Sequence, residues 1–308
     1  MQSLVVQRLV VCLLASGCTS EEPEAPVWSK TAELSDGDCP DLTESGLTSF
    51  SSHGEERSLW LALPDTVEPG LPVIFVWHGL AAPEMEPARL TYEGWGLQQV
   101  ASERNAIVVA PASRTITWPL VGNMALWGIL HDEEPDLVLY DDVRTCLAQT
   151  YDVDLSRVSS MGHSGGGLWN TALVVNRSET LASFAEYSGG ANLDLPMPNG
   201  PFLWWFDPPH NPPGLFVSGG DSDKWPSLDL VIIDFEASTG EAARQAHQTG
   251  SEVVRCHHQL GHNSIPSDMV TLGFDWMLDH RWGEASPMLD RTLPVGCKVG
   301  PDPEPDGS

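Results

Sequence analysis

A serine inside a glycine-rich turn constrains this chain more than any other feature. Residues 162–167 read GHSGGG, directly after a strand candidate at 157–161 and before a helix candidate at 168–173. A G-x-S-x-G turn between a strand and a helix is strained, and it pushes the serine hydroxyl out above the end of a sheet. The helix that begins there directs backbone N–H groups and its positive end at the serine. The turn predicts Ser164 as a nucleophile; the alternative is a glycine-rich turn without catalysis.

Short apolar runs alternate with helical stretches along the rest of the chain. Helical spacing is clearest at 230–247 and 268–282. The alternation predicts the α/β class, an α/β-hydrolase fold in which a mostly parallel central sheet forms the middle of a three-layer sandwich. The strand candidates are rich in Val and Ile and bounded by Gly or Pro, as buried strands are; they lie at 59–63, 73–77, 106–110, 157–161, 182–187, 215–217 and 252–255.

A serine hydroxyl needs a general base near neutral pH, and the base needs an acid to orient it. In this fold the chain order is serine, acid, histidine. His262 follows the last strand candidate and precedes the last helix, which is where the base is expected. A metal site formed by His257, His258 and His262 is the alternative for this histidine cluster.

The acid is expected in the loop after the strand candidate at 215–217. Asp223 is favoured because it comes shortly after the turn glycine Gly220. Asp221 is the alternative acid, although a turn aspartate that bonds its own backbone would look the same.

Two backbone donors are expected to bind the oxyanion of a tetrahedral intermediate. One is the N–H of Gly165, directly after the nucleophile. The other is the N–H of Leu80, in the loop after the strand candidate at 73–77, where Gly79 lets the backbone approach. His78 is expected to be a structural residue of this loop.

The N-terminus has the pattern of an export signal. Arg8 precedes a short apolar run, and small residues then lead to Cys18. The run is too short to span a bilayer as a mature helix. Residues 1–17 are therefore predicted to be a lipoprotein-type signal peptide, and Cys18 the lipidated residue; an ordinary signal peptide that is cut nearby is the alternative.

Charge and composition bound the remaining segments. Residues 18–38 are expected to form an acidic tether, 39–285 the α/β-hydrolase domain, and 286–308 a C-terminal extension with a disordered acidic tail. The stretch 192–213 is rich in proline and contains Trp204 and Trp205, and it is expected to be an irregular loop that faces substrate. A formal charge of −28 argues against nucleic acid as a partner.

Six cysteines divide into two groups. Cys12 is lost with the signal and Cys18 is used by lipidation. An even number then remains in an exported protein, so one or two disulfides are expected, with three possible full pairings among Cys39, Cys146, Cys256 and Cys297. None is part of a Cys-x-x-Cys pair, so a structural zinc site is not expected. No cofactor is expected either.

With these residues placed, the chain resembles the polyhydroxybutyrate depolymerase and feruloyl esterase-like group of secreted α/β hydrolases, from about residue 39 to 282. The resemblance implies an extracellular, metal-free carboxylic ester hydrolase with Ser164, Asp223 and His262 as its triad. The chain departs from the group in two places. Members commonly have a small or polar residue directly before the catalytic serine, where this chain has His163, and the loop after the acid is longer here, at 224–229. The motifs that carry the resemblance are Trp77-His78-Gly79, Tyr140-Asp141-Asp142-Val143, Tyr151-Asp152-Val153-Asp154 with Arg157, the Ser164 turn, Tyr187-Ser188-Gly189-Gly190 and Gly261-His262.

The sequence thus predicts an exported serine esterase that works through an acyl-enzyme. Its partner would be an ester substrate, either a small molecule, a glycan ester or a polyester. Contact with a membrane would be only through a lipid anchor on Cys18, which places the protein in a bacterial cell envelope, at the outer membrane or cell surface; otherwise it is secreted. The alternatives are a serine peptidase of the same fold and a non-catalytic surface lipoprotein that binds glycan or polyester.

Overall fold

A computed structural model describes residues 25–118, 122–130, 133–191, 208–226 and 231–302. Several predicted features lie outside these residues. They are the signal peptide at 1–17, the lipidation site Cys18, the start of the tether, the tryptophans Trp204 and Trp205, and the end of the acidic tail.

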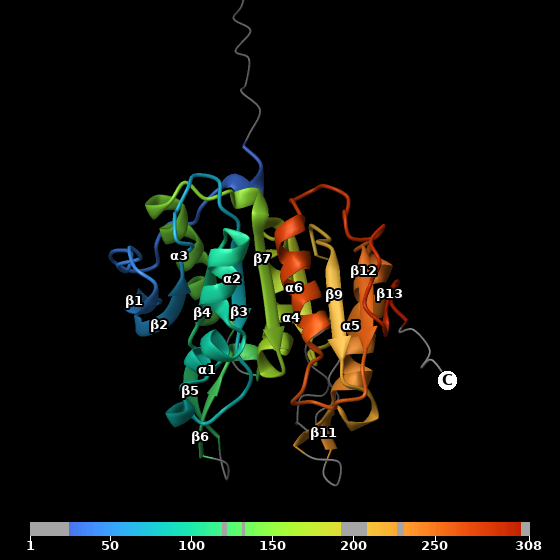
Figure 1. Cartoon of the computed structure of the whole chain (residues 1–308). Coiled ribbons are helices and arrows are strands. Elements are labelled where there is room, and N and C mark those ends of the chain that lie inside the picture. The colour runs from blue at the N-terminus through green and yellow to red at the C-terminus, as the bar shows by residue number, and fades with distance from the viewer. Residues whose placement is uncertain (1–24, 119–121, 131–132, 192–207, 227–230, 303–308) are drawn as a thin grey trace, which may run out of the picture.

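The centre of the described structure is a nine-stranded sheet (Figure 1) with the order β1-β2-β4-β3-β7-β8-β9-β12-β13. The six strands from β4 to β12 are parallel to one another, whereas β1, β2 and β13 pair antiparallel at the two edges. All seven predicted strands are present. The strands are β1 (Gly46–Ser52), β2 (Glu55–Ala62), β3 (Val73–Trp77), β4 (Ile107–Pro111), β7 (Val158–His163), β8 (Ser183–Tyr187), β9 (Gly214–Ser218), β12 (Val253–His257) and β13 (Cys297–Val299).

Helices cover both faces of this sheet, as the predicted three-layer sandwich requires. The helices α3 (Glu134–Thr150), α4 (Gly165–Arg177) and α5 (Phe235–Thr249) share one core cluster with the sheet. On the other face, α2 (Leu97–Arg104) and α6 (Ser267–Asp279) share the second cluster, and α1 (Pro87–Gly94) also packs against the sheet. The central strands β3, β4, β8 and β9 are buried along their whole length, because helices lie on both sides of them.

Two hairpins extend from the edge of the sheet where the parallel strands end (Figure 1). One pairs β5 (Arg114–Trp118) with β6 (Gly122–Leu126), and the other pairs β10 (Lys224–Pro226) with β11 (Val231–Asp234). The second hairpin corrects the predicted helix at 230–247. Residues 231–234 of the predicted helix are extended, and α5 begins only after Asp234. The side chain of Asp234 caps the helix by accepting a 3.1 Å hydrogen bond from Ala237 N.

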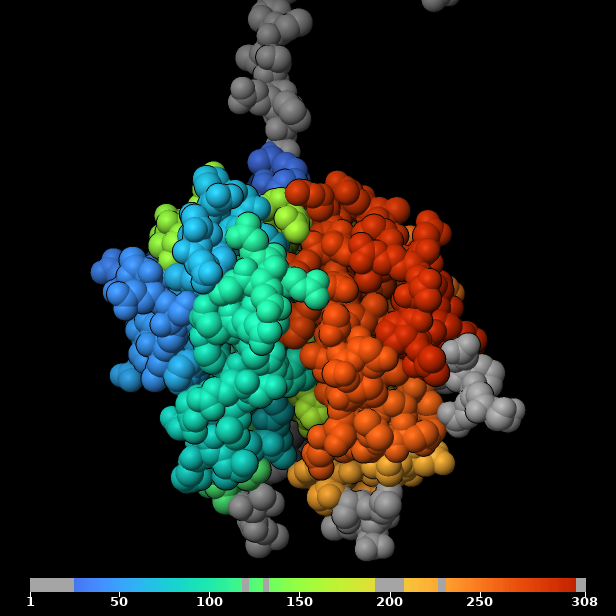
Figure 2. All heavy atoms as spheres, in the orientation of Figure 1, coloured from blue at the N-terminus to red at the C-terminus, as the bar shows by residue number. Residues whose placement is uncertain are grey.

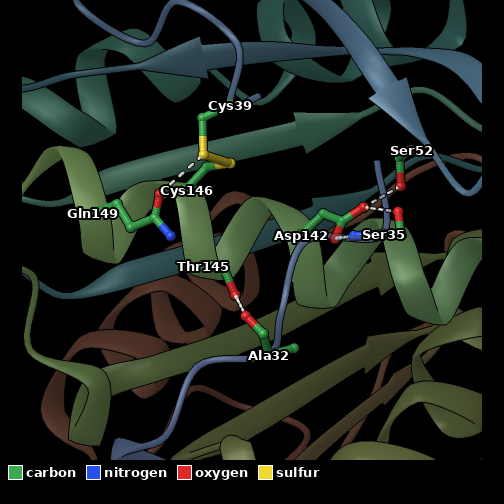
Figure 3. Close-up of a disulfide and its surroundings, with 8 residues drawn as sticks. All are labelled: Ala32, Ser35, Cys39, Ser52, Asp142, Thr145, Cys146 and Gln149. Atoms are coloured by element: carbon green, nitrogen blue, oxygen red, sulfur yellow. Dashed lines mark hydrogen bonds between the residues drawn. A yellow bond between two sulfur atoms is a disulfide. The ribbon is translucent and has the colours of Figure 1, made fainter. Parts of the chain in front are cut away.

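The described part of the predicted tether, residues 25–38, packs against the domain (Figure 3). Asp142 on α3 accepts hydrogen bonds from Ser35 N at 2.9 Å and Ser52 Oγ at 2.7 Å. Arg144 Nη1 on the same helix donates to the carbonyl of Lys30 at 2.8 Å. This segment is therefore part of the folded domain, because buried polar groups of α3 use its backbone as their partner.

Two of the three pairings left open by the sequence are excluded by the disulfides of the structure. Cys39 is bonded to Cys146, which joins the N-terminal segment to α3 (Figure 3), and Cys256 is bonded to Cys297. The second bond joins β12 to β13, so the C-terminal extension contributes an edge strand to the central sheet. Across the described ranges, no helix has both the length and the apolar character needed to cross a membrane.

Candidate active site

Ser164 lies at the sharp turn between β7 and α4. Its backbone has φ 57° and ψ −124°, a conformation that non-glycine residues rarely adopt. The turn is closed by backbone packing that leaves no room for side chains. A Cβ on Gly162 would lie 2.2 Å from Gly166 O, and a Cβ on Gly166 would lie 2.1 Å from Trp77 O. These glycines are therefore required for the turn that presents Ser164.

The structure brings three of the predicted site residues together in one hydrogen-bonded chain. His262 Nε2 lies 2.9 Å from Ser164 Oγ, and His262 Nδ1 lies 2.7 Å from Asp223 Oδ1. The neutral tautomer that fits both contacts carries its hydrogen on Nδ1, donates it to the carboxylate and leaves Nε2 free to accept the serine proton. This is the arrangement that a general base beside a hydroxyl nucleophile needs.

Asp223 is held by three donors in a fully buried position. In addition to His262, Ser188 Oγ donates to Asp223 Oδ2 at 2.8 Å and Gly219 N donates to the same oxygen at 2.7 Å. Burial on its own would raise the pKa of Asp223, but these hydrogen bonds to the ionised form outweigh it and hold the pKa below its ordinary value. The alternative acid, Asp221, is exposed and lies in the 3₁₀ turn η6 (Gly220–Ser222).

The two predicted oxyanion donors lie next to each other beside the serine. A Cβ on Gly165 would lie 3.0 Å from Leu80 N, and a Cβ on Gly79 would lie 3.1 Å from Ser164 Cβ. Because a Cβ at position 79 would lie tightly against the Ser164 side chain, glycine favours the close approach of this loop to the serine.

His78 anchors the loop that carries Leu80. Its Nε2 accepts a 3.0 Å hydrogen bond from Ser113 N, and its Nδ1 donates to Gly79 O at 2.7 Å. Trp127 Nε1 donates to the His78 carbonyl at 2.8 Å. Burial lowers the pKa of His78 to about 4, so the ring is neutral and its two nitrogens can make opposite kinds of hydrogen bond. His78 is thus a structural residue, as expected from the sequence.

Comparison with known proteins gives matches in structure. No protein-family model matches the sequence, and no curated protein does. Native pOPH matches with a TM-score of 0.67 and 18% identity, over 86% of this chain and 97% of pOPH. The fold is that of the α/β hydrolases.

Two named hydrolases share this α/β-hydrolase fold with the chain. The carboxylesterase EstE1, cloned from a metagenomic library, has a TM-score of 0.54 and 12% identity over 78% of this chain and 90% of its own. The S-formylglutathione hydrolase of Agrobacterium tumefaciens has a TM-score of 0.50 and 15% identity over 78% of this chain and 95% of its own. These neighbours are consistent with the esterase-like group that the sequence motifs resemble.

Two further residues hold Asp223 and His262 in place without having been predicted for that role. Ser188 follows β8 with φ 47°, which aims its hydroxyl at Asp223. Phe235, the first residue of α5, stacks on the His262 ring at 4.3 Å between centroids, with 18° between the planes. Ser188 belongs to a motif that carries the family resemblance, so that motif was the available signal; nothing in the sequence singled out Phe235.

The other histidines of the cluster are directed elsewhere. His257 Nδ1 lies 3.1 Å from Glu236 Oε1, and His258 Nδ1 accepts a 3.2 Å hydrogen bond from Leu260 N. Within the residues that the structure describes, no group of three or more His, Cys, Asp and Glu side chains is arranged to hold a metal ion. His262 therefore faces the serine and Asp223 rather than a shared ligand position with its two neighbours.

His163, the residue that departs from the family pattern, lies against the base. Its Nε2 is 2.9 Å from the His262 carbonyl, and the two rings are 5.1 Å apart. Burial, together with the nearby His262, lowers the pKa of His163 to about 4. The neutral ring can then donate to the carbonyl, which steadies the loop that carries His262.

Proposed function

We propose that this chain is a serine hydrolase that cleaves carboxylic esters through an acyl-enzyme intermediate. The observation that carries the proposal is the continuous hydrogen-bonded chain from Ser164 Oγ through His262 to Asp223. The turn that strains Ser164 and the two adjacent backbone donors support it, since each is an element of acyl transfer. The esterases among the structural neighbours have the same fold and fit the same reaction class.

In the proposed reaction, His262 Nε2 takes the proton of Ser164 as Oγ attacks the ester carbonyl. Asp223 keeps the imidazole oriented and stabilises its positive charge, while the N–H groups of Gly165 and Leu80 bind the oxyanion. The imidazolium then gives the proton to the departing alkoxide, the bond from carbonyl carbon to alcohol oxygen breaks, and the alcohol leaves. Water then attacks the acyl carbon while His262 takes its proton. The imidazolium gives that proton to Ser164 Oγ as the acyl bond to the serine breaks, which releases the acid and restores Ser164.

We also propose that the protein works outside the cytoplasm, tethered through lipid on Cys18. Two disulfides in the described residues support this, because such bonds persist in oxidising compartments. The acidic surface supports an uncharged or cationic substrate over a polyanion, since the formal charge is −28.

The test is hydrolysis of p-nitrophenyl acetate together with labelling by an organophosphonate. The Ser164→Ala variant should lose roughly 10⁴-fold or more in kcat and all covalent labelling. Ser264→Ala, an exposed serine two residues after His262, serves as the matched control and should keep both. Labelling that persists in Ser164→Ala would refute the proposed nucleophile. A folded wild type that turns over an aminoacyl anilide but no ester would identify a peptidase instead.

A further inference from the structure

A hollow of about 480 Å³ lies beside the nucleophile turn. Figure 2 shows it as a recess between the segment around α1 and the segment that follows His262, with atoms of the nucleophile region visible at its base. Its size lies within the range of small-molecule sites, roughly 300–1,000 Å³. The side chains that line it include Trp95, His163, Asn263, Ile265, Val270 and Thr271.

The position of the hollow relative to the triad identifies which part of an ester it faces. It is lined by the residue before Ser164 and by the residue after His262, so it lies on the side of the base. Its described lining includes the direct neighbours of Ser164 and His262 but neither of these two residues themselves, and it does not include the oxyanion donors Gly165 and Leu80. In acyl transfer the leaving oxygen must lie next to His262 Nε2, because that nitrogen gives it the proton. The hollow flanks this position, so an alcohol that extends away from the oxyanion donors would reach it.

The lining indicates the chemistry of that alcohol. No Asp, Glu, Lys or Arg is among the described residues that line the hollow. Trp95, Ile265 and Val270 supply apolar surface, and Asn263 and Thr271 supply neutral hydrogen-bonding groups. Such a surface gains free energy by covering apolar area and offers no partner for a formal charge.

The Trp95 side chain, which forms one wall of the hollow, is held in place by its packing against other aromatic rings. The indole of Trp95 meets the ring of Tyr187 edge to face at 5.2 Å, and that of Phe274 at 6.3 Å. A wall fixed before the ligand arrives loses little side-chain entropy on binding. A flat apolar group is the ligand that such a wall favours.

We propose that this hollow is the leaving-group site of the enzyme and that it selects uncharged alcohols with a flat apolar body, such as benzyl alcohol. The proposal rests on the hydrolase function proposed above. It makes Trp95, Ile265, Val270 and Thr271 specificity-determining residues for the alcohol, with no influence on the acyl group.

The test compares acetate esters of two alcohols of similar acidity, ethanol and benzyl alcohol. The wild type should show a kcat/KM for benzyl acetate about 10-fold or more above that for ethyl acetate, a ratio typical of filling an apolar pocket. Thr271→Trp, at an exposed position on α6, fills the hollow and should bring that ratio close to one. The ratio of ethyl butanoate to ethyl acetate should stay as in the wild type, because the acyl group does not enter the hollow.

Ser264→Trp is the matched control, since this exposed residue lies in the same loop but does not line the hollow. It should keep the preference for the benzyl ester. If Thr271→Trp does not fold, as judged by its melting temperature, Val270→Phe takes its place. A benzyl preference that survives in a folded filling variant, or a change in acyl preference instead, would overturn the assignment.

A second measurement uses the same acyl-enzyme throughout. With p-nitrophenyl acetate as donor, added benzyl alcohol competes with water: its oxygen bonds to the acyl carbon, its proton passes through His262, and Ser164 is released. The wild type should form benzyl acetate beside acetate, and Thr271→Trp should lower that product ratio about 10-fold. A wild type that neither hydrolyses ethyl acetate nor is labelled at Ser164 would refute the hydrolase function itself, which is a separate result from an unchanged product ratio.

Discussion

Several buried side chains near the site are neutral because of where they lie. Burial lowers the pKa of both His78 and His163 to about 4, and it raises the pKa of Glu186 on β8 to about 8. In each case the charged form would lie away from water without a full set of partners, which costs free energy. One oxygen of Glu186, Oε2, has no hydrogen-bond partner in the described structure.

The hydrogen bonds around Glu186 agree with a protonated carboxyl. Thr171 Oγ1 lies 2.7 Å from Glu186 Oε1 and 2.8 Å from Gly190 O. The hydroxyl has a single hydrogen, and a carbonyl oxygen can only accept. The threonine can therefore donate to Gly190 only if the carboxyl donates to the threonine, which requires Glu186 to carry a proton.

Glu186 should make the folded protein less stable as the pH rises. Its folded pKa of about 8 lies above the ordinary value of 4.5, so the folded chain binds the proton more tightly and the stability it contributes is lost between pH 4.5 and 8. The free energy of unfolding in urea should fall by a few kcal/mol over this window through Glu186. The histidines act oppositely, since their contribution is lost as the pH falls from 6.5 to about 4.

The comparison that checks this uses Glu186→Gln beside Glu103→Gln, a change of the same kind at an exposed position. The first variant should lose most of the alkaline decrease in unfolding free energy, and the control should follow the wild type. Equal pH dependence in the two variants would mean that Glu186 is ionised in the folded protein.

At the scale of elements, the loop that carries Asp223 is hydrogen-bonded to the first turn of α5. Glu236 Oε2 accepts a hydrogen bond from Gly220 N at 3.0 Å and another from Ser218 Oγ. Its Oε1 lies 3.1 Å from Arg255 Nη2 on β12. Arg255 is almost fully buried, with 1% of its side chain exposed. Glu236 thus links β9, the loop that carries Asp223, and the strand that leads to His262.

Removing this carboxylate should affect both stability and catalysis. Glu236→Ala leaves the Arg255 charge buried without its partner, so the unfolding free energy should fall by about 3–5 kcal/mol. The kcat for p-nitrophenyl acetate should fall while KM changes little, because the loop that orients Asp223 loses two of its hydrogen bonds. Glu241→Ala, which removes a partly exposed ion pair with Arg244 on the same helix, is the control for stability and rate. Adding Arg255→Met should restore part of the stability; no restoration would mean that the pair is not the cause.

The elements that sequence patterns predicted are those with a strong local signal. The parallel strands were predictable because burial on both faces demands continuous runs such as 73–77 and 106–110. The edge strands β1 and β13 were not predictable, because β13 has only three residues and five of the seven residues of β1 are Gly, Ser or Thr, so neither differs from a loop in composition. Residues 231–234 read as helix because apolar spacing over so few residues fits both periods.

The site shows the same division. Ser164, Asp223 and His262 follow from a local turn and a chain order, so the sequence predicted residues that the structure brings together. Ser188 and Phe235 act through contacts across 35 and 27 residues of chain respectively, to Asp223 and His262. Only tertiary packing reveals such partners, because a serine after a strand or a phenylalanine at a helix start has no distinguishing pattern.

At the scale of the whole molecule, two disulfides hold the outer segments to the domain. The Cys39–Cys146 bond joins residues 107 apart, and the Cys256–Cys297 bond joins residues 41 apart. Closing loops of this length in the unfolded chain typically contributes about 2–5 kcal/mol each. The N-terminal segment that would lead to a lipid anchor is thereby bonded covalently to α3. Force applied at such an anchor would be transmitted to this helix through the disulfide.

The anchor itself should decide where the protein is found. We expect the wild type in the membrane fraction and labelled by radioactive palmitate, because two acyl chains give stable attachment whereas one does not. Cys18→Ala should be unlabelled and soluble. Cys12→Ala, within the predicted signal peptide, is the matched control and should behave as the wild type. An unlabelled, soluble wild type would instead indicate an ordinary signal peptide.

The spacing of the triad along the chain also sets the order in which activity arises. The serine precedes its base by 98 residues, and the acid precedes that base by 39. A ribosome therefore makes the residues of the Ser164 turn well before those of β12, the following loop and α6, between which His262 lies. Until then, the Ser164 hydroxyl of the growing chain lacks the imidazole of His262, the base proposed to deprotonate it. In the proposed mechanism, hydrolysis would begin only when the last quarter of the polypeptide has packed against the sheet, so unfinished chains would be harmless to esters around them.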